Sequence, residues 1–155
     1  MAFFQLKTTQ KLNTSLNEIW DFISSPKNLK EITPDYMGFD ITSDNVDDKM
    51  YQGMIISYKV SPIMGIKTDW VTEITHVKDL AYFVDEQRVG PYKLWHHQHK
   101  VTEIEGGILM EDIVTYAPPF GFLGKIANAV MIKHKLAEIF EYRKLVLKNK
   151  YGEIE

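Results

Sequence analysis

The feature that most constrains the fold of this chain is a run of strand-like segments followed by one long helix. Between residues 54 and 116, apolar and polar side chains alternate, which is typical of strands with one buried face. Gly90-Pro91, Gly106-Gly107 and Pro118-Pro119 interrupt this run and indicate turns. The spacing then changes to that of an amphipathic helix, predicted from Leu123 to about Lys148. We therefore expect a meander of antiparallel strands with a helix behind it.

Two shorter helices are predicted ahead of the meander. Ser15 and Glu18 have the spacing of a capping box, which predicts a helix that reaches Ile23. Pro26 is typical of a first helical position and predicts a second, short helix through Ile32. The predicted strands cover residues 3–12, 39–41, 54–60, 66–74, 81–89, 92–104 and 108–116. The apolar stripe predicted on the C-terminal helix comprises Phe122, Ile126, Ala129, Ile132, Leu136, Phe140 and Leu147.

This order of one strand, two helices, six strands and one helix predicts an α+β fold. A curved antiparallel sheet of about seven strands would wrap around the long C-terminal helix. A curved sheet and a single helix do not always fill the space between them, and this mismatch can leave an internal ligand cavity. The length of 155 residues fits a single domain, predicted to span residues 1–155.

Composition excludes several functional classes. The chain has no Cys, so it has no disulfide, no thiolate nucleophile and no thiolate metal ligand. The net charge is −3 and the Lys and Arg residues are scattered, which argues against a nucleic-acid partner. The most apolar stretch, residues 117–132, is too short to span a bilayer, and no signal peptide is evident. We therefore expect a cytoplasmic protein without stable membrane insertion, whose oligomeric state the sequence leaves open.

Polar residues interrupt the inward faces of three neighbouring predicted strands. Asp85 and Gln87 share a face with Phe83, His97 and His99 share one with Trp95, and Asp112 shares one with Tyr116. Buried charges are costly unless they are paired, so these five polar residues could form one mutually satisfying cluster. Such a cluster would line the cavity and orient a ligand. Alternatively it is purely structural, or a bulge shifts one of the faces to the other side of the sheet.

The two histidines of the His97-x-His99 motif point to the same side of a strand. They could bind zinc if a third ligand such as Asp85 or Asp112 joined them, whereas His96 points to the opposite face. With no Cys and no evident tight third ligand, we expect no metal ion and no cofactor. A general acid–base role for His97 or His99 beside a carboxylate is an alternative, since imidazole titrates near neutral pH.

Four groups of residues resemble one known superfamily. The first third of the chain carries Trp20-x-Phe22, Pro26-x-Asn28-Leu29 and Ile32-Thr33-Pro34. The middle carries Phe83-x-Asp85-x-Gln87-x-x-Gly90-Pro91-Tyr92-x-x-Trp95-x-His97-x-His99. The last third carries Asp112-x-Val114-x-Tyr116-x-x-Pro119-x-Gly121 and Ile139-Phe140-x-Tyr142-Arg143. With these motifs, the chain over its full length resembles the START-like, birch-pollen-allergen-like helix-grip superfamily (SRPBCC), and within it the polyketide-cyclase and ligand-binding branch.

The resemblance implies a helix-grip fold whose cavity binds or carries a hydrophobic small molecule without catalysis, such as a lipid, a polyketide-like or an isoprenoid compound. The superfamily also contains cyclases, so a cyclase-, aromatase- or dehydratase-like enzyme that uses His97 and an acid such as Asp112 is an alternative. A protein whose apolar rim meets a membrane or a partner is a second alternative. The residues expected to contact the ligand are Trp70, Phe83, Asp85, Gln87, Trp95, His97, His99, Asp112, Tyr116, Phe120, Phe122, Ile126 and Val130.

Two apolar, turn-rich segments are candidates for the rim of the cavity. Residues 117–124 contain Phe120 and Phe122, which would gate entry if they lined the opening, or fill the core if they did not. Residues 60–65 form a predicted hairpin tip that carries Ile63 and Met64. This second segment could be a lid of the cavity, or it could contact a partner or a membrane.

Overall fold

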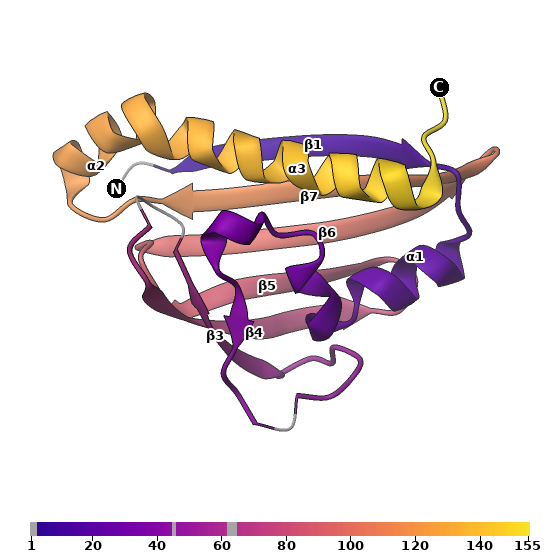
Figure 1. The fold of residues 1–155 in the computed structure, drawn as a ribbon, viewed down its shortest axis with the longest axis horizontal. Coiled ribbons are helices and arrows are strands. Elements are labelled where there is room, and N and C mark those ends of the chain that lie inside the picture. Colours follow the sequence, from indigo (N-terminus) through magenta and orange to yellow (C-terminus); the bar gives the residue numbers. More distant parts are fainter. Residues whose placement is uncertain (1–2, 45, 62–64) are drawn as a thin grey trace.

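The computed structural model describes residues 3–44, 46–61 and 65–155 and shows a curved sheet with a long helix on one side (Figure 1). The strands are β1 (Phe4–Leu12), β2 (Asp40–Ile41), β3 (Ile55–Val60), β4 (Thr68–Lys78), β5 (Tyr82–Val89), β6 (Leu94–Ile104) and β7 (Gly107–Ala117). The helical segments are α1 (Leu16–Ile23), η1 (Pro26–Lys30), η2 (Asp35–Met37), α2 (Gly121–Ala127), η3 (Asn128–Ile132) and α3 (Lys133–Tyr151). The predicted α+β fold and its long C-terminal helix are confirmed.

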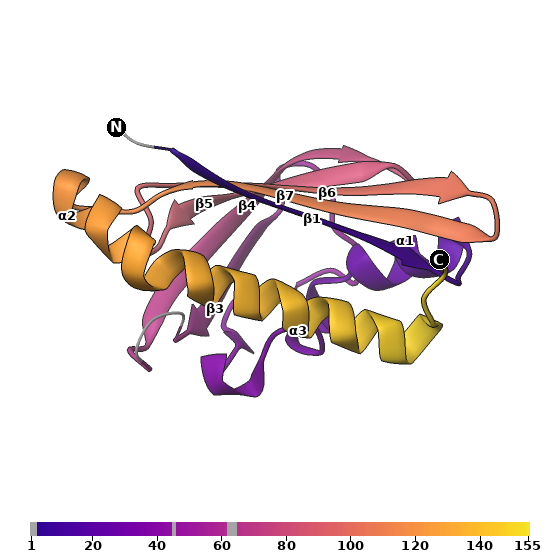
Figure 2. The same ribbon diagram turned by 90° about the horizontal axis from the view of Figure 1, so that it is seen from above.

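The strands form one antiparallel sheet in the order β1-β7-β6-β5-β4-β3-β2. The first strand, β1, therefore pairs with β7, the last strand of the meander, and the short β2 is the edge strand on the other side of the sheet. Two register shifts between β4 and β5 bend the sheet, as bulges do. Figure 2 shows the resulting curvature, with α3 running along one side of the sheet.

Local sequence explains the first helix. Ser15 caps α1, because its hydroxyl accepts a hydrogen bond from the Glu18 amide at 3.2 Å. The Glu18 carboxylate does not return to Ser15 and instead accepts from the Thr14 hydroxyl at 2.7 Å. The second predicted helix is a shorter 3₁₀ segment, η1, with Pro26 at its start. The cap prediction is thus confirmed, whereas the reciprocal half of the capping box is wrong.

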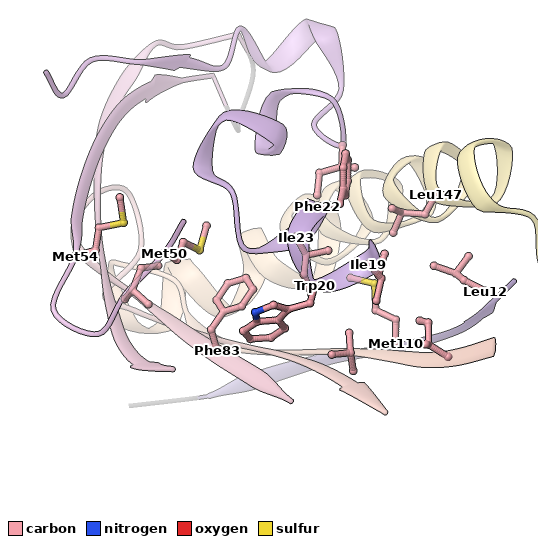
Figure 3. Packing of buried hydrophobic residues seen from close by; sticks show 14 of the residues in the cluster. Leu12, Ile19, Trp20, Phe22, Ile23, Met50, Met54, Phe83, Met110 and Leu147 are labelled. Carbon is pink, nitrogen blue, oxygen red and sulfur yellow. The ribbon is translucent and has the colours of Figure 1, made fainter. Parts of the chain in front are cut away.

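Buried apolar residues pack on both sides of α1. Figure 3 shows Ile19, Trp20 and Ile23 of α1 between the sheet and the last turns of α3, where Leu147 lies. A second group, around Trp70 and Phe140, packs between the middle of the sheet and α3. Burial of these two groups removes apolar surface from water and thereby holds α1 and α3 against the sheet.

The C-terminal helix begins earlier and buries a different face than the sequence predicted. Helical residues continue from Gly121 to Tyr151, but η3 is a π-helical turn. From Ile132 onward the predicted stripe is buried, whereas Phe122, Ile126 and Ala129 before it are exposed, contrary to the prediction. The wider π-turn changes the phase of the buried face, and α2 lies beyond the end of the sheet (Figure 1).

The predicted strand boundaries are less accurate than the strands themselves. Ile66, expected beside Trp70 and Ile74, precedes β4 and is two-thirds exposed. The predicted strand over residues 39–41 is reduced to the two residues of β2. In the part of the chain that the structure describes, none of the helices has the length and apolar character needed to cross a membrane.

Candidate functional site

A cavity of about 140 Å³ lies between the concave face of the sheet, α3 and the segment that carries η1 and η2. The side chains around it come from strands β3 to β6, from α3, from this segment and from the loops before β3 and before β6. They are Leu29, Ile32, Thr33, Met37, Phe39, Met50, Ile56, Tyr58, Val60, Trp70, Thr72, Ile74, Phe83, Asp85, Tyr92, Trp95, His97, His99, Leu136, Ile139, Phe140 and Arg143. Most of this wall is apolar, and its charged groups are confined to one side.

Strand alternation places the polar side chains of this wall. Trp95, His97 and His99 occupy alternate positions of β6 and all line the cavity. The register sets Asp85 of β5 opposite His97, and Asp112 of β7 opposite His99. Two carboxylates therefore flank the two imidazoles, one on each neighbouring strand.

The imidazoles bind the carboxylates along the diagonals of the sheet. His99 Nε2 lies 2.6 Å from Asp85 Oδ2, and His97 Nε2 lies 2.9 Å from Asp112 Oδ1. The second nitrogen of each ring is also near a carboxylate, because His97 Nδ1 is 3.5 Å from Asp85 Oδ2 and His99 Nδ1 is 3.2 Å from Asp112 Oδ1. The two ring centres are 3.6 Å apart. All four groups thus form one compact unit.

A fifth residue, Arg143 of α3, completes what we call the polar cluster: Asp85, His97, His99, Asp112 and Arg143. Its Nη1 donates to Asp112 Oδ1 at 3.0 Å, and the residue is only 8% exposed. A guanidinium inside the fold needs such a partner, because an unpaired buried charge is costly. The long helix therefore contributes the positive charge that balances the carboxylates of the sheet.

Burial and neighbouring charges shift the pKa values of the two histidines in opposite directions. Burial lowers the pKa of His97 to about 4, and the charge of His99 contributes to this lowering, so His97 is neutral at pH 7. Burial also opposes the charging of His99, but the nearby carboxylates of Asp112 and Asp85 raise its pKa above the ordinary value. Burial likewise opposes the ionisation of Asp112, yet Arg143 and the histidines hold its pKa well below the usual range. The two carboxylates and the guanidinium together carry one net negative charge, which the polar cluster balances whenever His99 is protonated.

The part of the wall next to the polar cluster is aromatic, because Trp95 lies beside His97 with ring centres 6.2 Å apart. Trp70 meets Trp95 edge to face with ring centres 5.2 Å apart, and Tyr92 packs against Trp95 at 5.1 Å. The indole of Trp70 donates to the Thr72 hydroxyl at 3.0 Å, which also lies 2.8 Å from the Tyr58 hydroxyl. The polar atoms of Trp70 and Tyr58 are therefore hydrogen-bonded within the protein, and the faces of these rings remain for apolar contact.

Comparison with solved structures identifies the architecture. Neither a protein-family profile nor a curated protein sequence matches the chain. Major latex-like protein 151 from Panax ginseng matches with a TM-score of 0.66 at 9% identity, over 96% of this chain and 97% of that one. Ara h 8.0201 matches with 0.59 at 12% identity, over 96% and 99%. Protein TTHA0849 from Thermus thermophilus matches with 0.67 at 13% identity, over 95% and 96%.

The chain has the helix-grip fold. This is the fold of the START-like superfamily, as the resemblance of its motifs predicted. At such low identities the likeness shows the fold alone and carries no ligand over to this chain.

The helix-grip fold brings together six of the residues expected to contact a ligand. Those on the cavity wall are Trp70, Phe83, Asp85, Trp95, His97 and His99. Asp112 lies behind the two histidines and is itself buried. The side chain of Gln87 is hydrogen-bonded to the backbone of Tyr92. Its Nε2 donates to the Tyr92 carbonyl oxygen at 2.7 Å, and its Oε1 accepts from the Tyr92 amide at 3.2 Å. The Tyr116 hydroxyl donates to Asn128 of the π-turn at 2.8 Å. Asp112, Gln87 and Tyr116 therefore support the wall from outside the cavity.

The other four expected contacts lie at the N-terminal end of the C-terminal helix, in and just before α2 and η3. Phe120, Phe122, Ile126 and Val130 are 81%, 74%, 48% and 72% exposed and are not part of the cavity wall. With the exposed Leu123 they form what we call the apolar end. The second expected rim, residues 60–65, contains residues 62–64, which lie outside the described part of the chain.

Gly124 is held in place rather than left free. A Cβ atom at this position would lie 2.0 Å from the carbonyl oxygen of Pro119, so only glycine allows α2 to fold back on the preceding turn. The packing of this turn therefore requires the glycine.

Sequence reasoning missed Arg143 as a member of the site. In the sequence it stands out only as the last residue of the motif Ile139-Phe140-x-Tyr142-Arg143, with no role in the site. Its spacing from Phe140 and Leu147, three and four residues away, places it on the same helix face as these buried side chains. A charged residue on an apolar helix stripe, facing a predicted carboxylate cluster, was the signal that could have revealed it.

Proposed function

We propose that this chain binds and carries a hydrophobic small molecule in the cavity, without transforming it. The observation that supports this proposal is the division of one cavity wall into a large apolar part and a single polar cluster. The apolar part would provide affinity by removing ligand surface from water, and the polar cluster would fix the orientation of one polar group.

The volume restricts the ligand. Drug-sized ligands occupy cavities of roughly 300–1,000 Å³, whereas an engineered cavity of about 150 Å³ in another protein accepts benzene. A cavity of about 140 Å³ therefore matches a single ring. A lipid, an isoprenoid or a polyketide-like chain would place one ring or short branch here, and α3 or the η1–η2 segment would have to move to admit the rest.

The polar cluster favours a ligand that donates a hydrogen bond. Asp85 and His97 line the cavity, and the carboxylate of Asp85 and a ring nitrogen of neutral His97 both accept hydrogen bonds. The side chain of Asp85 retains 15% exposure and lines the cavity. A hydroxyl or phenol group fits this wall better than a carboxylate does.

Paired ligands test this proposal. We expect 4-propylphenol to bind at least ten-fold more tightly than propylbenzene, with shifts of the indole N–H signals of Trp70 and Trp95 in NMR spectra. Asp85→Asn should reduce this preference, and His76→Gln, which changes an exposed histidine of β4, should leave it unchanged. If neither compound shifts the two indole signals, the proposal is wrong.

The natural ligand can be sought directly. Native mass spectrometry of the protein purified from its own host should reveal a co-purifying lipophilic compound, and solvent extraction would release it for identification. Ile139→Trp, which adds volume at the cavity wall, is the matched variant and should lose the bound mass.

One observation favours an enzyme as the second candidate. Neutral His97 faces the cavity and is hydrogen-bonded to the buried carboxylate of Asp112, an arrangement that suits a general base of a cyclase- or dehydratase-like reaction. Proton exchange at the α-carbon of cyclohexanone in D₂O would report such a base. The enzyme hypothesis expects His97→Gln to abolish the exchange while binding persists, and the carrier hypothesis expects no protein-dependent exchange in either protein.

A further inference from the structure

Three donor atoms of the polar cluster converge on one point of the cavity wall. Asp85 Oδ2 lies 2.6 Å from His99 Nε2 and 3.5 Å from His97 Nδ1. The donor atoms of these three residues all lie within 4.8 Å of one another. Two imidazole nitrogens and one carboxylate oxygen are a common ligand set for Zn²⁺ and similar ions. We propose that Asp85, His97 and His99 bind a divalent transition-metal ion, such as Zn²⁺, with a further coordination position open to the cavity.

The far sides of the two imidazoles support this assignment. Asp112 Oδ1 lies 2.9 Å from His97 Nε2 and 3.2 Å from His99 Nδ1, and it accepts a hydrogen bond from Arg143. Histidine ligands of metals usually donate their other N–H to a carboxylate, which fixes the tautomer and the orientation of the ring. Asp112 is placed to do this for both histidines at once.

If both histidines donate a hydrogen bond to Asp112, their other ring nitrogens face Asp85 with lone pairs, and the point between these three atoms needs a cation. If His97 Nε2 and His99 Nδ1 carry the protons, then His97 Nδ1 and His99 Nε2 present lone pairs toward Asp85 Oδ2. Three lone pairs that face one another repel, so a proton or a metal ion has to lie between them. In the described structure His99 Nδ1 is buried and has no hydrogen-bond partner, although Asp112 is near. A small rotation of this ring would complete its bond to Asp112.

The distances allow an ion after a small adjustment. Donor atoms about 2.0–2.2 Å from a tetrahedral zinc ion lie about 3.3 Å from each other. The separation of His97 Nδ1 from Asp85 Oδ2, 3.5 Å, is already near this value. The contact of 2.6 Å between His99 and Asp85 has to widen by about 0.7 Å, which a turn of the short Asp85 side chain achieves.

The local charges also favour a cation. Asp85 and Asp112 together carry two negative charges, and Arg143 supplies one positive charge. A divalent ion would leave one excess positive charge, which hydroxide or an anionic group of a cavity ligand would balance. The ion would thereby act as a Lewis acid toward a phenolate, enolate or carboxylate in the cavity.

Metal titration of the folded protein tests the site. The protein is first treated with a chelator, and Zn²⁺ is then titrated by calorimetry while Co²⁺ is followed by visible absorption. We expect one ion per chain. Asp85→Asn and His99→Gln should each weaken binding at least ten-fold, and Asp112→Asn by roughly 10–100-fold. The control His76→Gln, which changes an exposed histidine outside the cavity, should bind like the wild type.

NMR spectra of the unmutated protein keep the test independent of variant folding. Zn²⁺ should shift the ring-nitrogen signals of His97 and His99 and leave that of His76 in place. The proposal is overturned if the folded wild type binds no stoichiometric ion, because a proton alone then fills the position. It is equally overturned if binding survives both Asp85→Asn and His99→Gln in folded protein. Ligand binding can persist in either case, so failure here is distinct from failure of the proposed carrier function.

Discussion

The polar cluster and the apolar end depart from the usual distribution of side chains in opposite directions. The polar cluster places ionisable groups inside the fold, with His97, His99 and Asp112 at most 5% exposed. The apolar end places large apolar groups outside it, with Phe120 at 81% and Phe122 at 74% exposed. Buried polar groups and exposed apolar patches are the informative exceptions in a folded protein. Both regions are therefore candidates for functional roles of different kinds.

The two regions differ in whether the protein itself satisfies them. The polar cluster is paired and balanced by Arg143, so its geometry is fixed before any ligand arrives. The apolar end contacts little of the described chain, and the nearby charges in residues 118–137 are positive, from Lys125, Lys133 and Lys135. An internal wall that is preorganised suits recognition of a small molecule, whereas an exposed apolar surface is typical of contact with something larger.

The first prediction concerns Arg143, whose positive charge pairs with the buried carboxylate of Asp112. Arg143→Met should lower the free energy of unfolding by about 3–5 kcal/mol, because it leaves a buried carboxylate without its partner. Urea denaturation measures this change. The control Lys148→Met, an exposed residue of the same helix, should change stability by less than about 0.5 kcal/mol. A similar small effect of Arg143→Met would mean that the cluster is not balanced by this residue.

The second prediction concerns pH in the metal-free protein. Burial lowers the pKa of His97 to about 4, from 6.5 in the unfolded chain. Between these values the unfolded chain binds a proton that the native protein does not, so stability should fall as pH decreases from about 6.5 to about 4. His99 contributes no slope there, because its raised pKa keeps it protonated in the native protein throughout this window and its stabilisation is lost only at higher pH.

The expected loss of unfolding free energy across this window is about 2–3 kcal/mol, measured by urea denaturation at several pH values. His97→Gln should remove this part of the pH dependence, whereas His76→Gln should retain it. An unchanged slope in His97→Gln would contradict a neutral, buried His97.

The polar cluster could be predicted from sequence because it depends on a short-range rule. Alternation along each strand aims Asp85, His97, His99 and Asp112 to one face, and an antiparallel meander makes their strands neighbours. The bulges between β4 and β5 do not disturb this register, because β6 pairs with β5 and β7 without a shift. The sequence therefore contained most of the site, except for the guanidinium from a distant helix.

The apolar end could not be predicted in the same way. A regular helical period through Phe122 and Ile126 placed these residues on the buried stripe of Leu136 and Phe140. The π-turn at residues 128–132 changes this phase, and the extent of the sheet decides where burial ends. Both depend on tertiary packing, which a local apolar pattern does not record.

The third prediction concerns the junction between the two regions. The Tyr116 hydroxyl donates to Asn128, the buried amide of the π-turn, at 2.8 Å. Tyr116→Phe should cost about 1–3 kcal/mol, because the Asn128 oxygen is left without its donor. Hydrogen exchange should show faster opening of residues 128–132. Exchange that stays as slow as in the wild type would show that other contacts hold the π-turn.

The fourth prediction has the smallest effect on stability and tests the apolar end itself. The double substitution Phe120→Ser with Phe122→Ser should change the free energy of unfolding by less than about 0.5 kcal/mol, because both side chains are already in water. The same double substitution in the buried stripe, at Leu136 and Phe140, would be expected to prevent stable folding, since each large core side chain is worth about 2–5 kcal/mol.

Ligand exchange separates the two remaining roles of the apolar end. If Phe120 and Phe122 gate the cavity, which is one of the two alternatives from the sequence, the serine variant should release a bound phenol faster than the wild type in stopped-flow fluorescence. An unchanged release rate would contradict the gate and leave an external contact surface as the role of these side chains. Their distance from the cavity wall does not decide this point, because a gate acts on the opening and not on the bound ligand. The ligand release rate therefore tests the role of the apolar end, whereas the free energy of unfolding tests the polar cluster.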